Sequence, residues 1–184
     1  MCQKNIIKYE DIEIYKYGFE IIGSTILGFI ITLIIGLIFR MFLLSIAYYA
    51  MFVAIRQFTG GYHADSYFKC NLTFAIVTFF VFGLTKMAVY SKTYIMPNHI
   101  LSLVLSLIII WYYSPIENKN KPLDQEQKKR NKKISVALTL TISILSCTVY
   151  IFSVQSSALM AFTQLAIAVL IVITKMEIGG EKDE

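Results

Sequence analysis

The strongest constraint on the fold of this chain is a series of six long apolar stretches. A helix that crosses the roughly 30 Å hydrocarbon layer of a membrane needs about 20 apolar residues, and hydrophobic residues make up 57% of this sequence. The stretches cover residues 21–39, 41–55, 72–90, 99–113, 134–152 and 158–174. This pattern predicts an all-α, polytopic integral membrane protein with about six transmembrane helices in a single domain, residues 1–184.

The N-terminal part of the chain leaves alternatives open. The second apolar stretch is short and lies between Arg40 and Arg56, so it is either tilted or only partly inserted. The first two stretches then form either a tight hairpin or a re-entrant pair. Ahead of them, residues 5–19 mix apolar and charged side chains. That mixture predicts a short interfacial helix within an N-terminal segment, residues 1–20.

The distribution of lysine and arginine predicts the orientation, because positively charged loops tend to remain in the cytoplasm. Residues 117–133 hold seven basic residues against three acidic ones: Lys119, Lys121, Lys128, Lys129, Arg130, Lys132 and Lys133 against Glu117, Asp124 and Glu126. A basic cytoplasmic loop at 114–133 places both termini and residues 56–71 inside. Residues 91–98 and 153–157 are then outside, and Arg40 is the main exception to the rule.

The formal charge of +5 does not point to nucleic acid, since the basic residues gather beside apolar stretches. We therefore expect no nucleic-acid partner. The lysine-rich segment has two possible roles beyond setting the orientation. It can attract an acidic peptide, or it can bind the headgroups of anionic membrane lipids.

A short polar interval, FTGGYHADSYFKCN, separates the second and third apolar stretches and carries the candidate chemistry. It contains His63 and Cys70. A cysteine becomes a strong nucleophile when a base or a positive environment favours its thiolate. Cys147 lies inside an apolar stretch and Cys2 has no histidine near it in sequence, so both are weaker candidates. The histidines and cysteines lack the spacing of a metal site, and we expect no metal or other cofactor.

The spacing of His63 and Cys70 sets a geometric condition. Seven residues of straight helix separate two groups by roughly 10 Å, whereas a histidine that activates a thiol must lie within roughly 3 to 4 Å. The chain therefore has to bend at Gly60 and Gly61, or the site has to be completed across two chains. With a cap at Asp65 or Ser66, Cys70 would lie near the start of the third helix, where the helix dipole favours a thiolate. The plainer interpretation is a turn, an interfacial histidine and a small buried thiol.

Three sequence blocks resemble one family. The segment RQFTGGYHADSYFKC is similar to the signature of the AgrB family, the membrane cysteine peptidases of Gram-positive quorum-sensing systems. SPIENKNKPLDQEQKKRNKK resembles the cytoplasmic loop of that family, and YGFE at residues 17–20 resembles its N-terminal element. The resemblance implies a multi-pass protein of the plasma membrane of a Gram-positive bacterium.

The resemblance also implies a reaction. Cys70 attacks a peptide bond of an AgrD-type precursor peptide with His63 as general base and acid, and the C-terminal tail is released. The thioester on Cys70 is then attacked by a cysteine or serine of the precursor, which closes a thiolactone or lactone ring. A homodimer is a further implication.

Further positions match the family's pattern, with less certain roles. Glu20 either orients His63 or is an interfacial carboxylate, and Arg56 either binds substrate or oxyanion charge or marks a cytoplasmic helix end. Gln57 is a second oxyanion candidate on sequence position alone. The structural and second-loop positions are Gly60, Gly61, Pro115, Glu117, Lys119 and Pro122. The rival interpretations are a peptide transporter without proteolytic activity and an inert membrane scaffold.

Overall fold

The structure is a computed structural model, and it describes residues 12–60, 67–91, 96–116 and 123–180. These ranges form six helices and no strand longer than a single bridge. The helices are α1 (Ile12–Ile38), α2 (Phe42–Thr59), α3 (Tyr67–Ser91), α4 (Met96–Tyr113), α5 (Gln125–Tyr150) and α6 (Val154–Gly180). All six are long and apolar enough to cross a membrane, which confirms the all-α polytopic prediction.

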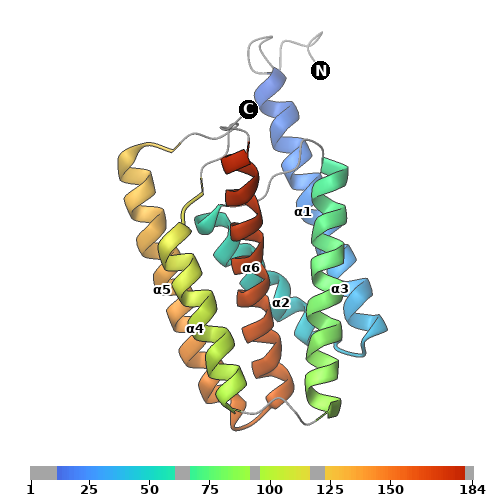
Figure 1. The fold of residues 1–184 in the computed structure, drawn as a ribbon. Coiled ribbons are helices and arrows are strands. Elements are labelled where there is room, and N and C mark those ends of the chain that lie inside the picture. Colours follow the sequence, from blue (N-terminus) through green and yellow to red (C-terminus); the bar gives the residue numbers. More distant parts are fainter. Residues whose placement is uncertain (1–11, 61–66, 92–95, 117–122, 181–184) are drawn as a thin grey trace.

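The helices alternate in direction, so the connections fall at two ends of the bundle (Figure 1). The start of α1, the end of α6, the α2–α3 junction and the α4–α5 junction lie at one end. The α1–α2, α3–α4 and α5–α6 junctions lie at the opposite end. The segments that share an end of the bundle are the same ones that the lysine and arginine distribution places on one side of the membrane. We call the first end the basic end, because it includes the basic residues at the start of α5.

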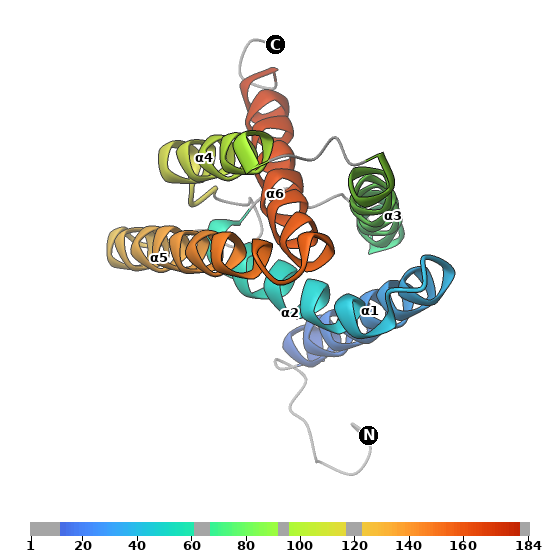
Figure 2. The same cartoon turned by 90° about the horizontal axis from the view of Figure 1, so that it is seen from below.

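Helix α6 occupies the centre of the bundle, and α2, α3, α4 and α5 all contact it (Figure 2). Within its membrane span 61% of residues are buried, against no more than 28% in any other span. Its buried face carries Ala158, Ala161 and Ala168, whose small side chains allow neighbouring helices to approach closely. Packing around α6 therefore organises the fold.

Polar side chains join α5 to α6 at membrane depth. The fully buried Gln164 donates from Nε2 to the Thr139 carbonyl oxygen at 3.1 Å, and its Oε1 accepts from the Ser143 hydroxyl at 3.0 Å. At the end opposite the basic end, the buried His99 ring nitrogen Nε2 lies 3.1 Å from the Ser157 hydroxyl. Such interhelical bonds stabilise membrane bundles because lipid offers the same groups no partner.

A tight turn joins α1 to α2, which supports the hairpin alternative for these helices. The Met41 N–H donates to the Gly36 carbonyl and the Arg40 N–H to the Leu37 carbonyl, the two bonds of a Schellman motif. Arg40 has φ of 54° at the position that usually holds glycine. Helix α2 has 18 residues, about 27 Å of helix, and crosses behind α6 at a tilt, as its short apolar length predicts (Figure 1).

The helices extend beyond the apolar stretches in several places. Helix α2 continues to Thr59 and α3 already begins at Tyr67, so both ends of the polar 56–71 segment are helical. Much of the predicted basic loop is helix as well, because α5 begins at Gln125 and the Asp124 carboxylate caps it by accepting from the Gln127 N–H. Hydropathy locates the part of a helix inside lipid, whereas capping and helix propensity decide where the helix ends.

The predicted interfacial helix differs from the structure in one respect. Its described residues, from Ile12 onward, are the first turns of α1 and run without a break into the membrane span. Residues 5–11 of the prediction lie outside the described ranges.

Candidate functional site

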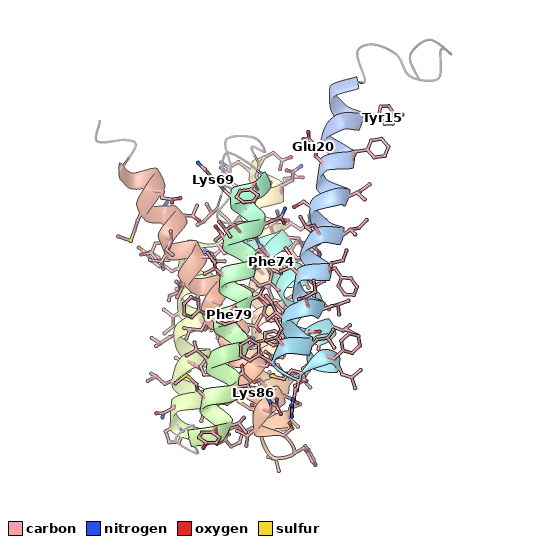
Figure 3. All side chains as sticks on the ribbon, turned by 90° about the vertical axis from the view of Figure 1, so that its right-hand side faces the viewer. Tyr15, Glu20, Lys69, Phe74, Phe79 and Lys86 are labelled. Carbon is pink, nitrogen blue, oxygen red and sulfur yellow. The ribbon has the colours of Figure 1, made fainter. Side chains whose placement is uncertain are left out.

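Cys70 lies in the first turn of α3, as the sequence predicts, and its free thiol is half-buried. The N–H groups of the first helical turn have no partner within the helix, and the helix dipole there attracts negative charge. Its neighbour Lys69 is at the basic end of the bundle (Figure 3). This position combines access from the membrane surface with the unpaired N–H groups of a helix start.

Arg56 brings a positive charge to Cys70 from the neighbouring helix. It lies in the last turn of α2, half-buried, and its guanidinium attracts the thiolate form of Cys70. The guanidinium carbon is 5.7 Å from the ring centroid of Phe52, whose ring packs edge-on against Phe74 of α3 at 5.0 Å. These aromatic contacts tie the ends of α2 and α3 together around the pair.

Helix α1 reaches the site through the residue that follows the cysteine. The Ser24 hydroxyl donates to Asn71 Oδ1 at 3.1 Å. Glu20 lies one helical turn before Ser24, which places it on the same face of α1 and nearer the basic end. Figure 3 shows Glu20 and Lys69 at that same end. The half-buried Glu20 is therefore near the start of α3, at the level that the sequence predicts.

The end of α2 is joined to the segment that follows α4. The Ile116 N–H donates to the Thr59 carbonyl at 2.9 Å, and Gly60 and Ile116 form a parallel bridge. Pro115, from the second sequence block, lies between Ser114 and Ile116 in this connection, after a cis peptide bond. The structure thus brings together two sequence blocks that are more than 50 residues apart.

The remaining predicted residues divide into two groups. Gln57 is described and lies exposed in the last turn of α2, next to Arg56, and its oxyanion role stays a prediction. His63 and Gly61, the alternative caps Asp65 and Ser66, and the later positions Glu117, Lys119 and Pro122 lie outside the described residues. The distance between His63 and Cys70 therefore stays a prediction.

The basic residues before the fifth membrane span lie on a helix at the same end. Lys128, Lys129, Arg130, Lys132 and Lys133 occupy the first turns of α5. The Lys132 ammonium is 5.7 Å from the ring centroid of Trp111, so this side chain lies against α4. Among the residues that the structure describes, no cluster of three His, Cys, Asp or Glu side chains could hold a metal ion.

Several residues of the site were not identified from the sequence. Ser24 and Asn71 are an ordinary pair of polar residues in sequence, and nothing there indicates that they meet. Thr59 and Ile116 pair through backbone groups, so the types of these two residues do not indicate the contact. Of these residues, only Gly60 indicates a contact by its type, because glycine often stands where another backbone segment approaches closely.

Comparisons with known proteins relate this chain to one family. The profile of the family described as "Accessory gene regulator B" matches residues 1–176. Two curated relatives come from Clostridium perfringens. "Putative AgrB-like protein 2" of strain 13 / Type A is 29% identical over 117 residues, and "Putative AgrB-like protein" of strain SM101 / Type A is 30% identical over 117 residues.

Each alignment covers 62% of this chain and 55% of the relative, so the match spans about half of the relatives' length. No solved structure matches the chain. The family profile, in contrast, covers nearly all of the sequence, including the segments that contain Cys70, Arg56 and Ile116. The chain therefore belongs to the AgrB family, the accessory gene regulator B proteins.

Proposed function

We propose that this protein is a membrane cysteine endopeptidase that processes an AgrD-type precursor peptide for quorum sensing. The single observation that carries the proposal is the half-buried Cys70 thiol at the start of α3, near enough to the Arg56 guanidinium of α2 for the two to interact electrostatically. Family membership supports the substrate class, since accessory gene regulator systems process a signalling peptide.

The reaction proceeds in two acyl transfers. His63 accepts the Cys70 proton, the thiolate attacks the scissile carbonyl carbon, and the C–N bond breaks as His63 returns the proton to the departing amine. The C-terminal tail leaves, and the remaining peptide is bound to Cys70 as a thioester. A thiol or hydroxyl of the precursor then gives its proton to His63 and attacks the thioester carbonyl. The ring bond forms, the C–S bond to Cys70 breaks, and His63 returns the proton to the Cys70 thiolate. Since water would hydrolyse this intermediate, a site at the edge of the hydrocarbon favours cyclisation.

Arg56 stabilises the Cys70 thiolate in this scheme. The guanidinium is always charged, and at the edge of a low-dielectric layer its attraction for the thiolate is stronger than in water. The cation–π contact with Phe52 holds it in place. Glu20, near the start of α3, orients His63 or pairs with a neighbouring cation.

The basic end faces the cytoplasm in this proposal, because the basic first turns of α5 lie there. The precursor would approach from the cytoplasmic surface of the plasma membrane. The basic turns of α5 could bind an acidic segment of the precursor or anionic lipid headgroups. A homodimer would place two such sites side by side.

A peptide transporter without proteolytic activity is the rival function. A transport pathway through the bundle would be lined by polar groups that are free to bind a passing substrate. In the part of the chain that the structure describes, every buried polar side-chain atom has a hydrogen-bond partner. The buried hydroxyls between α4, α5 and α6 therefore fit packing contacts better than a pathway.

The test uses the purified full-length protein in liposomes with an AgrD-type precursor peptide. The released tail is followed by mass spectrometry for the wild type, Cys70→Ala and His63→Ala. We expect Cys70→Ala to abolish tail release and His63→Ala to reduce it at least about 100-fold, the usual size of general-base effects. Cys147→Ala is the matched control, because Cys147 is also a free, half-buried cysteine but lies near the opposite end of α5. Full tail release by Cys70→Ala would refute the proposed activity.

A further inference from the structure

We propose that Ile116 is a positioning residue of the peptidase site and that its backbone pairing with the end of α2 fixes the helical turn that carries Arg56. The inference rests on the proposed function and adds a residue that the reaction scheme does not use. It makes the segment after α4 a part of the site, although that segment lies far from Cys70 in sequence.

The pairing is a backbone contact in a buried position. The Ile116 N–H donates to the Thr59 carbonyl at 2.9 Å, while Thr59 is 0% exposed and Ile116 7% exposed. A parallel bridge continues the contact at Gly60. The Ile116 side chain belongs to the hydrophobic core cluster, so its burial holds the strand-like contact in place.

Gly60 is matched to this contact. Its φ is +67°, a conformation that residues with a Cβ rarely adopt. A Cβ added at Gly60 would overlap the Ile116 carbonyl oxygen and would lie 3.1 Å from the Ile116 carbonyl carbon. Two features of Gly60 thus favour glycine. One is its positive φ, and the other is the close approach of the Ile116 backbone.

A second contact fixes Ile116 from the other side. The Ser114 hydroxyl lies 3.0 Å from the Ser135 hydroxyl of α5, and both residues are buried. Ser135 also donates to the Lys132 carbonyl at 3.0 Å. The connection that contains Ile116 is therefore held between the end of α2 and Ser135 of α5.

The functional consequence follows from where the thiol and the positive charge near it are attached. Cys70 is held by α3, whereas Arg56 lies in the last turn of α2, where its carbonyl oxygen accepts from the Gly60 N–H at 3.1 Å. The last turn of a helix frays unless something holds it. Because a misplacement of about 1 Å can lower a rate about 100-fold, a contact that fixes the end of α2 acts on the rate of the reaction.

The test compares Gly60→Ala and Ile116→Ala with the wild type in the same liposome assay. Gly60→Ala introduces the overlap, and Ile116→Ala removes the side chain that anchors the bridge but keeps its N–H. Gly23→Ala is the matched glycine control, because a Cβ there would meet nothing within 4 Å. Kinetic constants for tail release are measured together with the thermal unfolding temperature in detergent.

A further readout separates positioning from general damage. In chains whose other cysteines, Cys2 and Cys147, are replaced, the rate of Cys70 alkylation at neutral pH reports how strongly the surroundings of the thiol favour its thiolate form. We expect kcat to fall about 10- to 100-fold in both variants with KM within about twofold of wild type. We also expect slower alkylation of Cys70 and an unfolding temperature close to that of Gly23→Ala.

Two results would overturn the inference. The first is a kcat within about threefold of wild type in both variants, since the contact would then not act on the reaction. The second is loss of folded protein in both variants, which would assign the contact to folding. Cys70→Ala in the same assay distinguishes these results from a failure of the proposed function, because tail release by Cys70→Ala would refute the peptidase itself.

Discussion

The Ser24 hydroxyl of α1 donates a hydrogen bond to Asn71 Oδ1 of α3, the residue directly after Cys70, at 3.1 Å. This bond is the polar link between the helix that carries Glu20 and the helix that carries the nucleophile. Below it, the Gly28 backbone lies close to the rings of Tyr49 and Phe74, and a Cβ at Gly28 would be 3.6 Å from each. The first helix is therefore held near the site by the Ser24–Asn71 hydrogen bond and by the close packing of Gly28 against these two rings.

Replacing Ser24 with alanine should lower both stability and activity slightly. Interhelical hydrogen bonds in membrane proteins contribute about 0.6 kcal/mol on average, so we expect a loss of this size in the free energy of unfolding and about a twofold decrease in kcat. Unfolding in detergent and tail release check this. Thr141→Val serves as the control, because the exposed Thr141 hydroxyl bonds only to a carbonyl of its own helix. Equal effects of the two variants would contradict a specific role of the Ser24 bond.

Replacing Arg56 with glutamine should make the Cys70 thiol less reactive at neutral pH. Removing a nearby positive charge disfavours the thiolate, which is the reactive form, so alkylation of Cys70 should become slower. The rate is measured in chains whose other cysteines are replaced. Arg40→Gln is the matched control, since Arg40 lies at the opposite end of the bundle. An unchanged alkylation rate in Arg56→Gln would refute the role of Arg56 in stabilising the thiolate.

Replacing Arg40 with glycine should stabilise the α1–α2 turn. Arg40 has φ of 54°, and a side chain in this left-handed conformation costs roughly 1 kcal/mol that glycine avoids. We expect the free energy of unfolding to rise by about 0.5 to 1 kcal/mol, as measured by denaturation in detergent. Arg40→Ala separates charge from conformation, because alanine removes the charge and keeps the Cβ. A gain of the same size in Arg40→Ala would show that the charge, and not the conformation, is unfavourable.

Replacing Gly36 with alanine should force the first two helices apart. The new Cβ would lie 2.5 Å from Ser45 Cβ and 2.6 Å from its hydroxyl oxygen, and Ser45 is fully buried on α2. Overpacking of this kind typically lowers stability by about 1 to 3 kcal/mol. Gly23→Ala has open space around it and should be neutral or slightly stabilising, since alanine is the better helix former. Equal unfolding temperatures of the two variants would argue against the close α1–α2 contact.

The predicted orientation can be tested with a membrane-impermeant thiol reagent. With Cys2 and Cys147 replaced, Cys70 should react in inside-out vesicles and remain unlabelled in intact cells, because the basic end should face the cytoplasm. A cysteine introduced at Phe152, an exposed residue at the opposite end, should show the reverse pattern. Labelling of Cys70 from outside intact cells would contradict the proposed orientation.

The sequence predicted the local features of the candidate site correctly. Cys70 lies at the start of a helix and Glu20 is at the same end of the bundle, as their positions beside apolar stretches indicate. The contacts between distant segments were not predictable in this way. Nothing about Ile116 as a residue type predicts that its N–H donates to the carbonyl of Thr59.

The number of membrane helices, their order and the charge at their ends were determined by the sequence alone. The reason is that the length and polarity of each segment decide locally whether it lies in lipid or in water. The tertiary structure decided that α6 is central, that Arg56 interacts electrostatically with Cys70 and that Ile116 pairs with Gly60. The physical reason is that lipid is as apolar as leucine. Apolar residues therefore do not reveal which face of a helix contacts protein, and only packing between helices selects the partners.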